Sequence, residues 1–174
     1  MTLERLWAGW RSDYIAGVTA DANSPPGADK DESICVFCRI LASDAPDEET
    51  YVVWRGDQAA VVLNAYPYTS GHVLVLPVRH VSDLEDLNAD ESAALWAGVT
   101  DAVRALKAAY RPDGINLGAN LGRAAGAGVP GHFHVHALPR WVGDTNFTTA
   151  VAETRVMPES LAATFDKVTA AWPR

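Results

Sequence analysis

The sequence predicts an α+β domain built on an antiparallel sheet of about five strands. Several short apolar runs with turn residues between them precede one long amphipathic segment, and two more strand-like runs follow it. The chain has 174 residues, enough to bury a sizeable core. Hydrophobic residues make up 48% of it and charged residues 21%, as in ordinary globular proteins.

Residues 1–32 are predicted to stand outside this domain. Trp7 and Trp10 lie about one helical turn apart and predict an arm that packs on the body or on a partner subunit. Residues 20–32 are polar and rich in proline and glycine, which is typical of a mobile linker. We therefore expect one folded domain over residues 33–174.

Three apolar runs predict the first strands. Residues 51–54 and 59–63 flank an Arg-Gly-Asp turn at 55–57, which is the pattern of a hairpin. Residues 72–77 are apolar enough for a central strand. The cysteine-containing segment 35–41 comes before these runs and predicts a turn that leads into a short helix.

The main helix is predicted to begin after Asn88. Asn88 and Glu91 have the spacing of a capping box, and the apolar stripe that follows lasts four turns, until residues 111–114 end it. Ser82 and Glu85 have the same spacing and predict a short helix just before.

The chain continues with two more strands and a final helix. Residues 115–121 and 133–138 are apolar runs joined by a glycine-rich loop. Residues 158–172 predict a C-terminal helix that begins near a proline. Strands before and after one long helix give the α+β layout.

Three histidines alternate in the last predicted strand. Side chains on a strand repeat every two residues, so His132, His134 and His136 should line one face while the apolar residues between them point into the core. A polar stripe of this kind is costly to desolvate, which disfavours a purely structural role. Two chemistries fit the pattern: hydrolysis by a zinc ion that the histidines hold, and covalent catalysis by an imidazole nitrogen.

The glycine-rich loop before the histidines favours a phosphate ligand. Residues 116–131 contain several glycines, whose backbone N–H groups can approach an anion closely. We expect Gly126 and Gly128 to contribute such donors to a substrate. Arg140, just after the histidines, could contact phosphate or form a surface ion pair.

At these positions the chain resembles a known family. Residues 132–138 match the pattern His-φ-His-φ-His-φ-φ of the histidine-triad (HIT) proteins, in which φ is an apolar residue. Asn64, followed by Ser-Gly-His-Val-Leu-Val-Leu-Pro at 70–77, is similar to the nucleoside-binding strand pair of that family. The resemblance covers residues 33–147. Residues 139–147 look like the branch that includes bacterial diadenosine tetraphosphate phosphorylases and related hydrolases.

The resemblance implies a role for each polar residue of these motifs. The central His134 would attack the α-phosphorus and form a nucleotidyl-histidine, and His136 would contact the phosphate oxygens and assist the leaving group. Asn120 would donate to the phosphate region. Asn64 would bind the ribose hydroxyls, and His72 would support the triad from behind. The acceptor would be water in a hydrolase or phosphate in a phosphorylase, and the flanking motifs favour the phosphorylase.

Cys35 and Cys38 predict a structural zinc site. Zinc takes thiolate and imidazole ligands in a tetrahedron, so two cysteines need two further donors. Zinc-bearing relatives look similar, and their pattern implies His80 and the first triad residue, His132, as these donors. A redox pair is disfavoured because no βαβ pattern surrounds the motif, and two buried thiols without metal stay open. A divalent cation could also accompany the polyphosphate substrate.

Composition limits the partners and the compartment. The net charge is −8, which argues against a general nucleic-acid binder. No apolar run is long enough to span a membrane, and no signal peptide is visible, so no membrane partner is expected. With only two cysteines, the chain is expected in a reducing, cytoplasmic setting. The resemblance also implies a homodimer whose subunits join their sheets.

Three alternatives to cleavage of a dinucleoside polyphosphate stay open at this point. A nucleoside 5'-phosphoramidate hydrolase would share the fold and the covalent intermediate but prefer an amine leaving group. A zinc-dependent hydrolase would use the triad as metal ligands. A nucleotide-binding or partner-binding module would bind without turnover.

Overall fold

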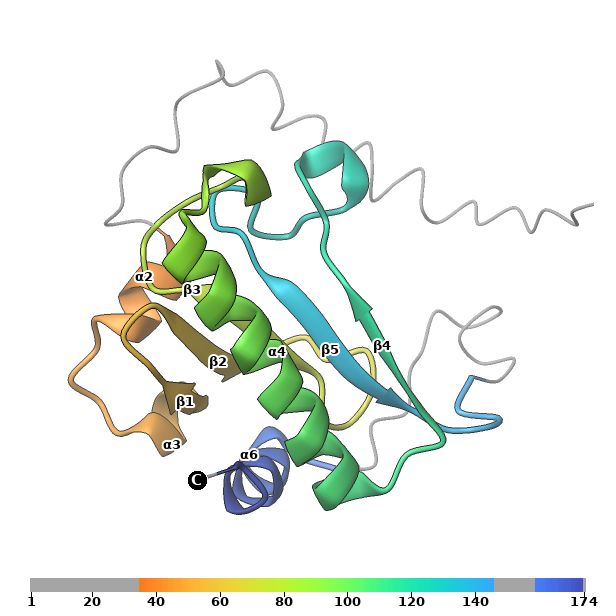
Figure 1. The fold of residues 1–174 in the computed structure, drawn as a ribbon. Helices are drawn as coiled ribbons and strands as arrows, with labels where there is room; N and C mark the ends of the chain where they lie inside the picture. The colour runs from red at the N-terminus through yellow and green to blue at the C-terminus, as the bar shows by residue number, and fades with distance from the viewer. Residues whose placement is uncertain (1–34, 146–158, 174) are drawn as a thin grey trace, which may run out of the picture.

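A five-stranded antiparallel sheet in the order β1-β2-β3-β5-β4 forms the centre of the structure (Figure 1). The computed structural model describes residues 35–145 and 159–173. The strands are β1 (Val52–Arg55), β2 (Ala59–Leu63), β3 (Val73–Pro77), β4 (Gly114–Gly118) and β5 (Val135–Arg140). The helices are α2 (Val36–Leu41), α3 (Asp47–Thr50), α4 (Ala89–Tyr110) and α6 (Leu161–Ala170), with 3-10 turns η2 (Leu84–Asp86) and η3 (Arg123–Ala125). The predicted α+β class is confirmed, whereas the N-terminal arm and linker predicted for residues 1–32 lie outside the described residues.

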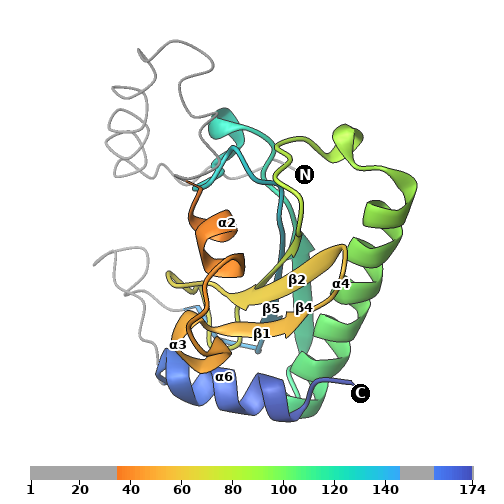
Figure 2. The same cartoon turned by 90° about the vertical axis from the view of Figure 1, so that its left-hand side faces the viewer.

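Two apolar clusters lie on opposite faces of the sheet. The long helix α4 covers one face and α2 lies against the other, as the two views show (Figure 2). On the α4 side, fully buried Leu95 and Leu106 pack with sheet residues such as Val75. On the α2 side, Phe37 packs with sheet residues such as Leu74. The sheet therefore presents two distinct faces, and the alternation of side chains decides which face each residue joins.

The last two strands differ from their predicted boundaries. β4 ends at Gly118, three residues before the predicted end, and β5 begins at Val135 instead of residue 133. The hydrogen-bonded pairing of β5 with β3 begins at Val135. Before that residue, the Phe133 N–H donates to Val81 O at 2.6 Å, beyond the end of β3. Phe133 still packs in the α4-side cluster together with Val135, so the predicted alternation continues beyond the hydrogen-bonded ladder.

Local capping signals were correct for the main helix and wrong for the short one. Asn88 caps α4, and the reciprocal bonds of a capping box with Glu91 are both present. The same spacing at Ser82 does not make a cap, because η2 has Asp83 and not Ser82 at its N-cap, without a side-chain capping bond; the Ser82 hydroxyl donates to the adjacent Asp83 carboxylate. Helix α3 was not predicted. Among the described residues, no helix has both the length and the hydropathy of a bilayer span.

An ion pair between the buried Glu91 and the exposed Arg79 joins the start of α4 to the segment after β3. Glu91, 2% exposed, accepts from Arg79 Nε at 2.6 Å and from Arg79 Nη2 at 2.8 Å. The guanidinium and the Asn88 N–H hold the pKa of Glu91 at about 2, below its ordinary 4.5. A carboxylate with a depressed pKa stabilises the fold above its unfolded pKa, and this contribution disappears as the pH falls through the folded pKa.

The Glu91→Gln variant should therefore show a flatter response to acid. Between pH 4.5 and pH 2, the free energy of unfolding of the natural protein will fall more steeply than that of the variant, because only the former must protonate Glu91 to lose the pair. Urea titrations across this pH range measure the difference. Glu85→Gln, at an exposed carboxylate, is the control and should parallel the natural protein. Equal slopes for Glu91→Gln and the natural protein would contradict this assignment.

Candidate active site and metal-binding cluster

The three triad histidines lie on the α2 side of the sheet, as the alternation predicts. The Phe37 ring of α2 makes edge contacts with His132 and His134, at centroid distances of 5.5 and 5.2 Å. His136 is paired across the sheet with Leu74, which packs in the same cluster as Phe37. The rings of His134 and His136 are neighbours, with centroids 5.0 Å apart.

His134 is held as a neutral imidazole with one defined tautomer. Its Nδ1 lies 2.8 Å from the main-chain oxygen of His132, and a carbonyl oxygen can only accept, so Nδ1–H is the donor. A neutral ring protonated at Nδ1 has a lone pair at Nε2. The side chain is 5% exposed, and burial lowers its pKa. His134 therefore has the form that a nitrogen nucleophile requires near neutral pH.

A chain of hydrogen bonds gives His136 the opposite tautomer. The Tyr68 N–H donates to His72 Nδ1 at 3.1 Å, so the His72 proton lies on Nε2. His72 Nε2–H then donates to His136 Nδ1 at 2.9 Å. Burial, followed by the field of His134, lowers the pKa of His136 to about 4, so its neutral ring carries the remaining proton at Nε2. His72 thus holds the His136 ring by a hydrogen bond, and the supporting role that the resemblance implies for it stays a prediction.

The Nε2 atom of His136 is buried and makes no hydrogen bond in the described part of the chain. A buried donor without a hydrogen bond lowers the stability of the fold by about 1–3 kcal/mol, so such atoms are rare unless a ligand supplies the acceptor. On the β4 side, His136 faces Gly118, where an added Cβ would meet no atom within 4 Å. The unpaired N–H and the space beside it are what an oxygen-rich ligand would use.

Asn64 organises the loop between β2 and β3. Its Oδ1 accepts from the Tyr66 N–H at 2.9 Å, and its Nδ2 donates to His72 Nδ1 at 3.3 Å. Both the oxygen and the nitrogen of the Asn64 amide therefore make hydrogen bonds within the protein. Binding of ribose hydroxyls by Asn64 stays a prediction. The same loop places the Tyr68 ring on His136, stacked at 5.9 Å with 14° between the planes. The sequence interpretation missed Tyr68, although its position four residues before His72 is a usable signal.

The glycine-rich loop is closed by Asn120, whose Nδ2 donates to Gly126 O at 3.3 Å. Gly126 has φ +92°, a left-handed conformation that side chains disfavour, so glycine is needed for the loop to turn there. Asn120 therefore helps to shape the glycine-rich loop, which is the candidate site for phosphate. Direct donation from Asn120, Gly126 or Gly128 to a ligand stays a prediction.

Cys35, Cys38, His80 and His132 form a cluster whose ligand atoms all lie within 4.8 Å of one another. His80 Nδ1 is 3.2 Å from Cys38 Sγ, and His132 Nδ1 is 3.4 Å from Cys35 Sγ. The two cysteines are not joined by a disulfide. Two sulfurs and two imidazole nitrogens at this spacing fit a tetrahedral zinc ion. This set, referred to below as the Cys/His cluster, is the set predicted from the resemblance.

His132 belongs to the Cys/His cluster and not to a metal site with the other triad members. Its Nε2–H donates to Pro77 O at 2.9 Å, which leaves the Nδ1 lone pair directed at the sulfurs. Burial lowers the pKa of His132 to about 4, which keeps the ring neutral, as a metal ligand must be. Among the described residues, the triad histidines do not form a second convergent group. This geometry disfavours zinc hydrolysis by the triad.

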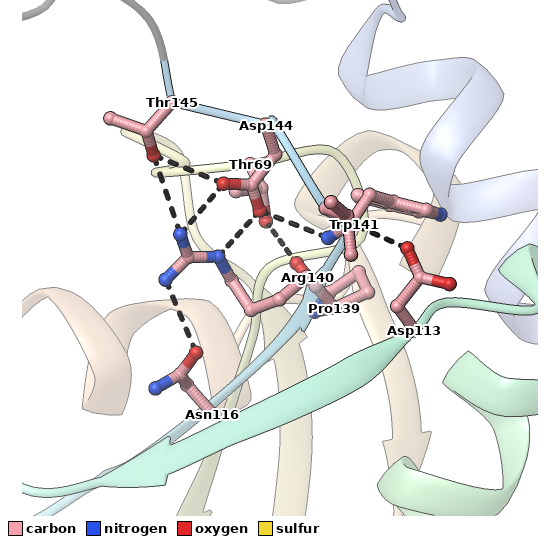
Figure 3. A network of polar contacts seen from close by, with 9 residues as sticks. Thr69, Asp113, Asn116, Pro139, Arg140, Trp141, Asp144 and Thr145 are labelled. Carbon is pink, nitrogen blue, oxygen red and sulfur yellow. Dashed lines mark hydrogen bonds and ion pairs between the residues drawn. The ribbon is translucent and has the colours of Figure 1, made fainter.

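Arg140 is held in an ion pair at the end of β5 (Figure 3). Its Nε and Nη2 donate to the two carboxylate oxygens of Asp144 at 2.6 and 2.7 Å, and its Nη1 donates to Asn116 of β4 at 3.2 Å. The guanidinium and the Trp141 N–H lower the pKa of Asp144. Of the two roles considered for Arg140, the structure supports the ion pair, and the additional hydrogen bond to Asn116 joins β4 to the end of β5.

Comparison with known proteins agrees with this geometry. The HIT domain family model matches residues 45–142. The AP-4-A phosphorylase of Mycobacterium tuberculosis is 40% identical over 172 residues, which cover 99% of this chain and 86% of that protein.

Two solved structures are also similar. One is a Zn-bound histidine triad family protein from Mycobacterium smegmatis, with a TM-score of 0.65 and 31% identity over 80% of this chain and 94% of that chain. The other is a hypothetical histidine triad nucleotide-binding protein from Sulfolobus tokodaii, with a TM-score of 0.64 and 29% identity over 79% and 91% of the two chains. The chain belongs to the HIT domain family.

Proposed function

We propose that this protein is an enzyme that transfers a nucleotidyl group from a dinucleoside polyphosphate to phosphate, through a covalent intermediate on His134. The observation that carries the proposal is the pair of complementary tautomers: a lone pair at His134 Nε2 beside an unpaired N–H at His136 Nε2. The similarity to AP-4-A phosphorylase supports both the substrate class and phosphate as the acceptor.

In the first step, His134 Nε2 attacks the α-phosphorus, and the bond from phosphorus to the bridging oxygen breaks. The leaving polyphosphate takes that oxygen and its electron pair. The ring becomes a cationic nucleotidyl-imidazole that keeps its Nδ1–H, and the carbonyl of His132 stabilises this charge. The His136 N–H donates to the phosphate oxygens as their charge increases, and backbone donors at Gly126 and Gly128 assist.

In the second step, a phosphate oxygen attacks the same phosphorus and the N–P bond breaks. The electron pair returns to His134 Nε2, and the ring is neutral again. For diadenosine tetraphosphate, the first step releases ATP and the second releases ADP. Asn64 would contact the ribose hydroxyls, next to the loop that it holds.

We also propose that the Cys/His cluster holds a structural zinc ion. Its donor set fits that metal, and the similar Mycobacterium smegmatis protein is Zn-bound. Bound there, zinc would supply cross-linking of α2 to the segments around β3 and β5 and no chemistry at the substrate. A divalent cation accompanying the polyphosphate, and a reducing cytoplasmic setting for the thiols, stay predictions.

We further propose a homodimer formed through β4. Within the described part of the chain, this strand has one neighbour in the sheet, β5, so its other edge presents backbone donors and acceptors outward. Leu117 of β4 and Trp96 of α4 are each 50% exposed. Joining two copies edge to edge would pair the backbone and cover apolar side chains of this region. Sedimentation velocity tests this arrangement, with Leu117→Asp expected to shift the protein to monomer.

Product analysis tests the proposed reaction. The protein is incubated with diadenosine tetraphosphate with and without inorganic phosphate, and the nucleotides are separated by chromatography. We expect ADP and ATP in equal amounts, formed only with phosphate. AMP and ATP without phosphate would make the protein a hydrolase on the same intermediate. Cleavage of an adenosine phosphoramidate, with no reaction of the tetraphosphate, would replace the proposed substrate class.

A further inference from the structure

We infer that the Cys/His cluster controls the catalytic nucleophile through Phe37, which the geometry assigns as a positioning residue for His134. The inference rests on the proposed function, because it concerns the step in which His134 reacts. It adds a residue and a purpose for the cluster beyond structural cross-linking.

Phe37 lies between the two cysteines in the sequence and between the cluster and the nucleophile in space. It is 5% exposed, and its ring makes edge contacts with the imidazoles of both His132 and His134. The His134 contact has an interplanar angle of 62°, so the phenyl ring limits rotation of the imidazole about its side-chain bonds. A cluster ligand and the nucleophile therefore share one aromatic neighbour.

The position of Phe37 depends on the cysteines around it. Helix α2 has six residues, and its N-cap, Cys35, makes no side-chain capping bond. A helix this short is not stable alone and takes its place from tertiary contacts. At its start those contacts are the sulfurs of Cys35 and Cys38, which lie close to His132 and His80. Metal bound to the cluster would fix the segment that carries Phe37.

A second connection runs through the backbone of His132. Its ring is held on one side by the sulfurs and on the other by Pro77 O, while its main-chain oxygen accepts from His134 Nδ1. The oxygen fixes which nitrogen of His134 carries the proton, and Phe37 restricts the ring plane. Together they direct the Nε2 lone pair. Displacement of a reactive group by about 1 Å can slow a reaction about 10²-fold, so a partial loss of this support should be measurable.

The test compares Phe37→Leu with Ile40→Val in the zinc-loaded protein. Leucine keeps an apolar side chain in the cluster but removes the ring edge. Ile40 is a partly buried residue of the same helix that packs in the same cluster, so its variant is a matched control. Three quantities are measured: zinc content, the single-turnover rate of labelling by α-labelled diadenosine tetraphosphate with its half-saturation concentration, and the His134 tautomer by nitrogen-15 NMR.

We expect Phe37→Leu to retain zinc, to label about tenfold more slowly with half-saturation within about twofold, and to show a mixed His134 tautomer or a broadened signal. Ile40→Val should match the natural protein. The inference is overturned if Phe37→Leu keeps the natural rate and tautomer, if it changes only half-saturation, or if Ile40→Val is equally slow.

Removing zinc provides an independent measurement. Chelation of the natural protein should alter the His134 nitrogen signals in the same direction as Phe37→Leu while circular dichroism still reports a folded chain. Unchanged His134 signals in folded, metal-free protein would contradict control by the cluster. Absence of any labelling in the natural protein would instead contradict the proposed function, and the NMR comparison would still decide whether Phe37 positions His134.

Discussion

Replacing His134 with Asn is expected to lower turnover of diadenosine tetraphosphate by at least about 10³-fold, because removal of a covalent nucleophile leaves only binding and charge stabilisation. Asparagine has a similar size, and its side-chain amide can still donate to His132 O, so the fold should be retained. Steady-state rates and the fraction of protein labelled after denaturation in mild alkali measure the effect. No label should remain on the variant.

The variant His136→Asn separates the nucleophile from its neighbour. Loss of one donor to the developing charge slows an enzyme by about 10²–10³-fold, but His134 Nε2 can still form the adduct. We therefore expect slow labelling of His136→Asn and none of His134→Asn. A His134→Asn protein that keeps a tenth of the natural turnover, or that carries label, would show that another group attacks phosphorus.

Removing the sulfurs of the Cys/His cluster is expected to have the largest effect on stability. A ligand present at 1,000 times its dissociation constant stabilises the folded state by about 4 kcal/mol, and for a chain of this size each kcal/mol corresponds to about 2–4 °C in Tm. The Cys35→Ser, Cys38→Ser double variant should therefore melt about 8–16 °C lower than the zinc-loaded protein. Thermal unfolding followed by circular dichroism, with and without added zinc, measures this difference.

Two comparisons test whether loss of zinc is the cause of the lower Tm. Chelation should lower the Tm of the natural protein by a similar amount and leave the double variant unchanged. Arg39→Ala, at an exposed position of α2, controls for substitution in this helix and should keep the natural Tm. A double variant that melts at the natural temperature, or a natural protein indifferent to both zinc and chelator, would remove the structural zinc from the proposal.

Local rules were sufficient for several features of the site. The alternation of the histidines placed them on one face, because a strand repeats every two residues whatever surrounds it. The capping box at Asn88 was correct because its two bonds involve residues three positions apart. The identical spacing at Ser82 failed because the short helix there begins one residue later than the spacing requires, with Asp83 at its N-cap. The spacing of a capping box therefore predicts a cap only where the helix begins at the expected residue.

The composition of the cluster needed the family resemblance, and its separation from His134 and His136, the proposed catalytic residues, needed the structure. Spacing alone could not decide which of the three alternating histidines bind a metal and which take part in the reaction. The division follows from contacts between distant segments. Pro77 O accepts from His132 Nε2, which leaves His132 Nδ1 for the cysteines, whereas His72 hydrogen-bonds to His136 Nδ1. Phe37 and Tyr68 were missed for the same reason, since their partners lie far along the chain.

By itself the sequence determined the antiparallel α+β fold, the face that the histidines share and the residue types available for zinc and for phosphorus chemistry, because these follow from side-chain period and from the donors each residue carries. Only the tertiary structure decided which nitrogen of each imidazole carries the proton. That choice is made by the partner of the other nitrogen: a carbonyl for His134 and a second imidazole for His136. Such partners meet only when the strands are assembled.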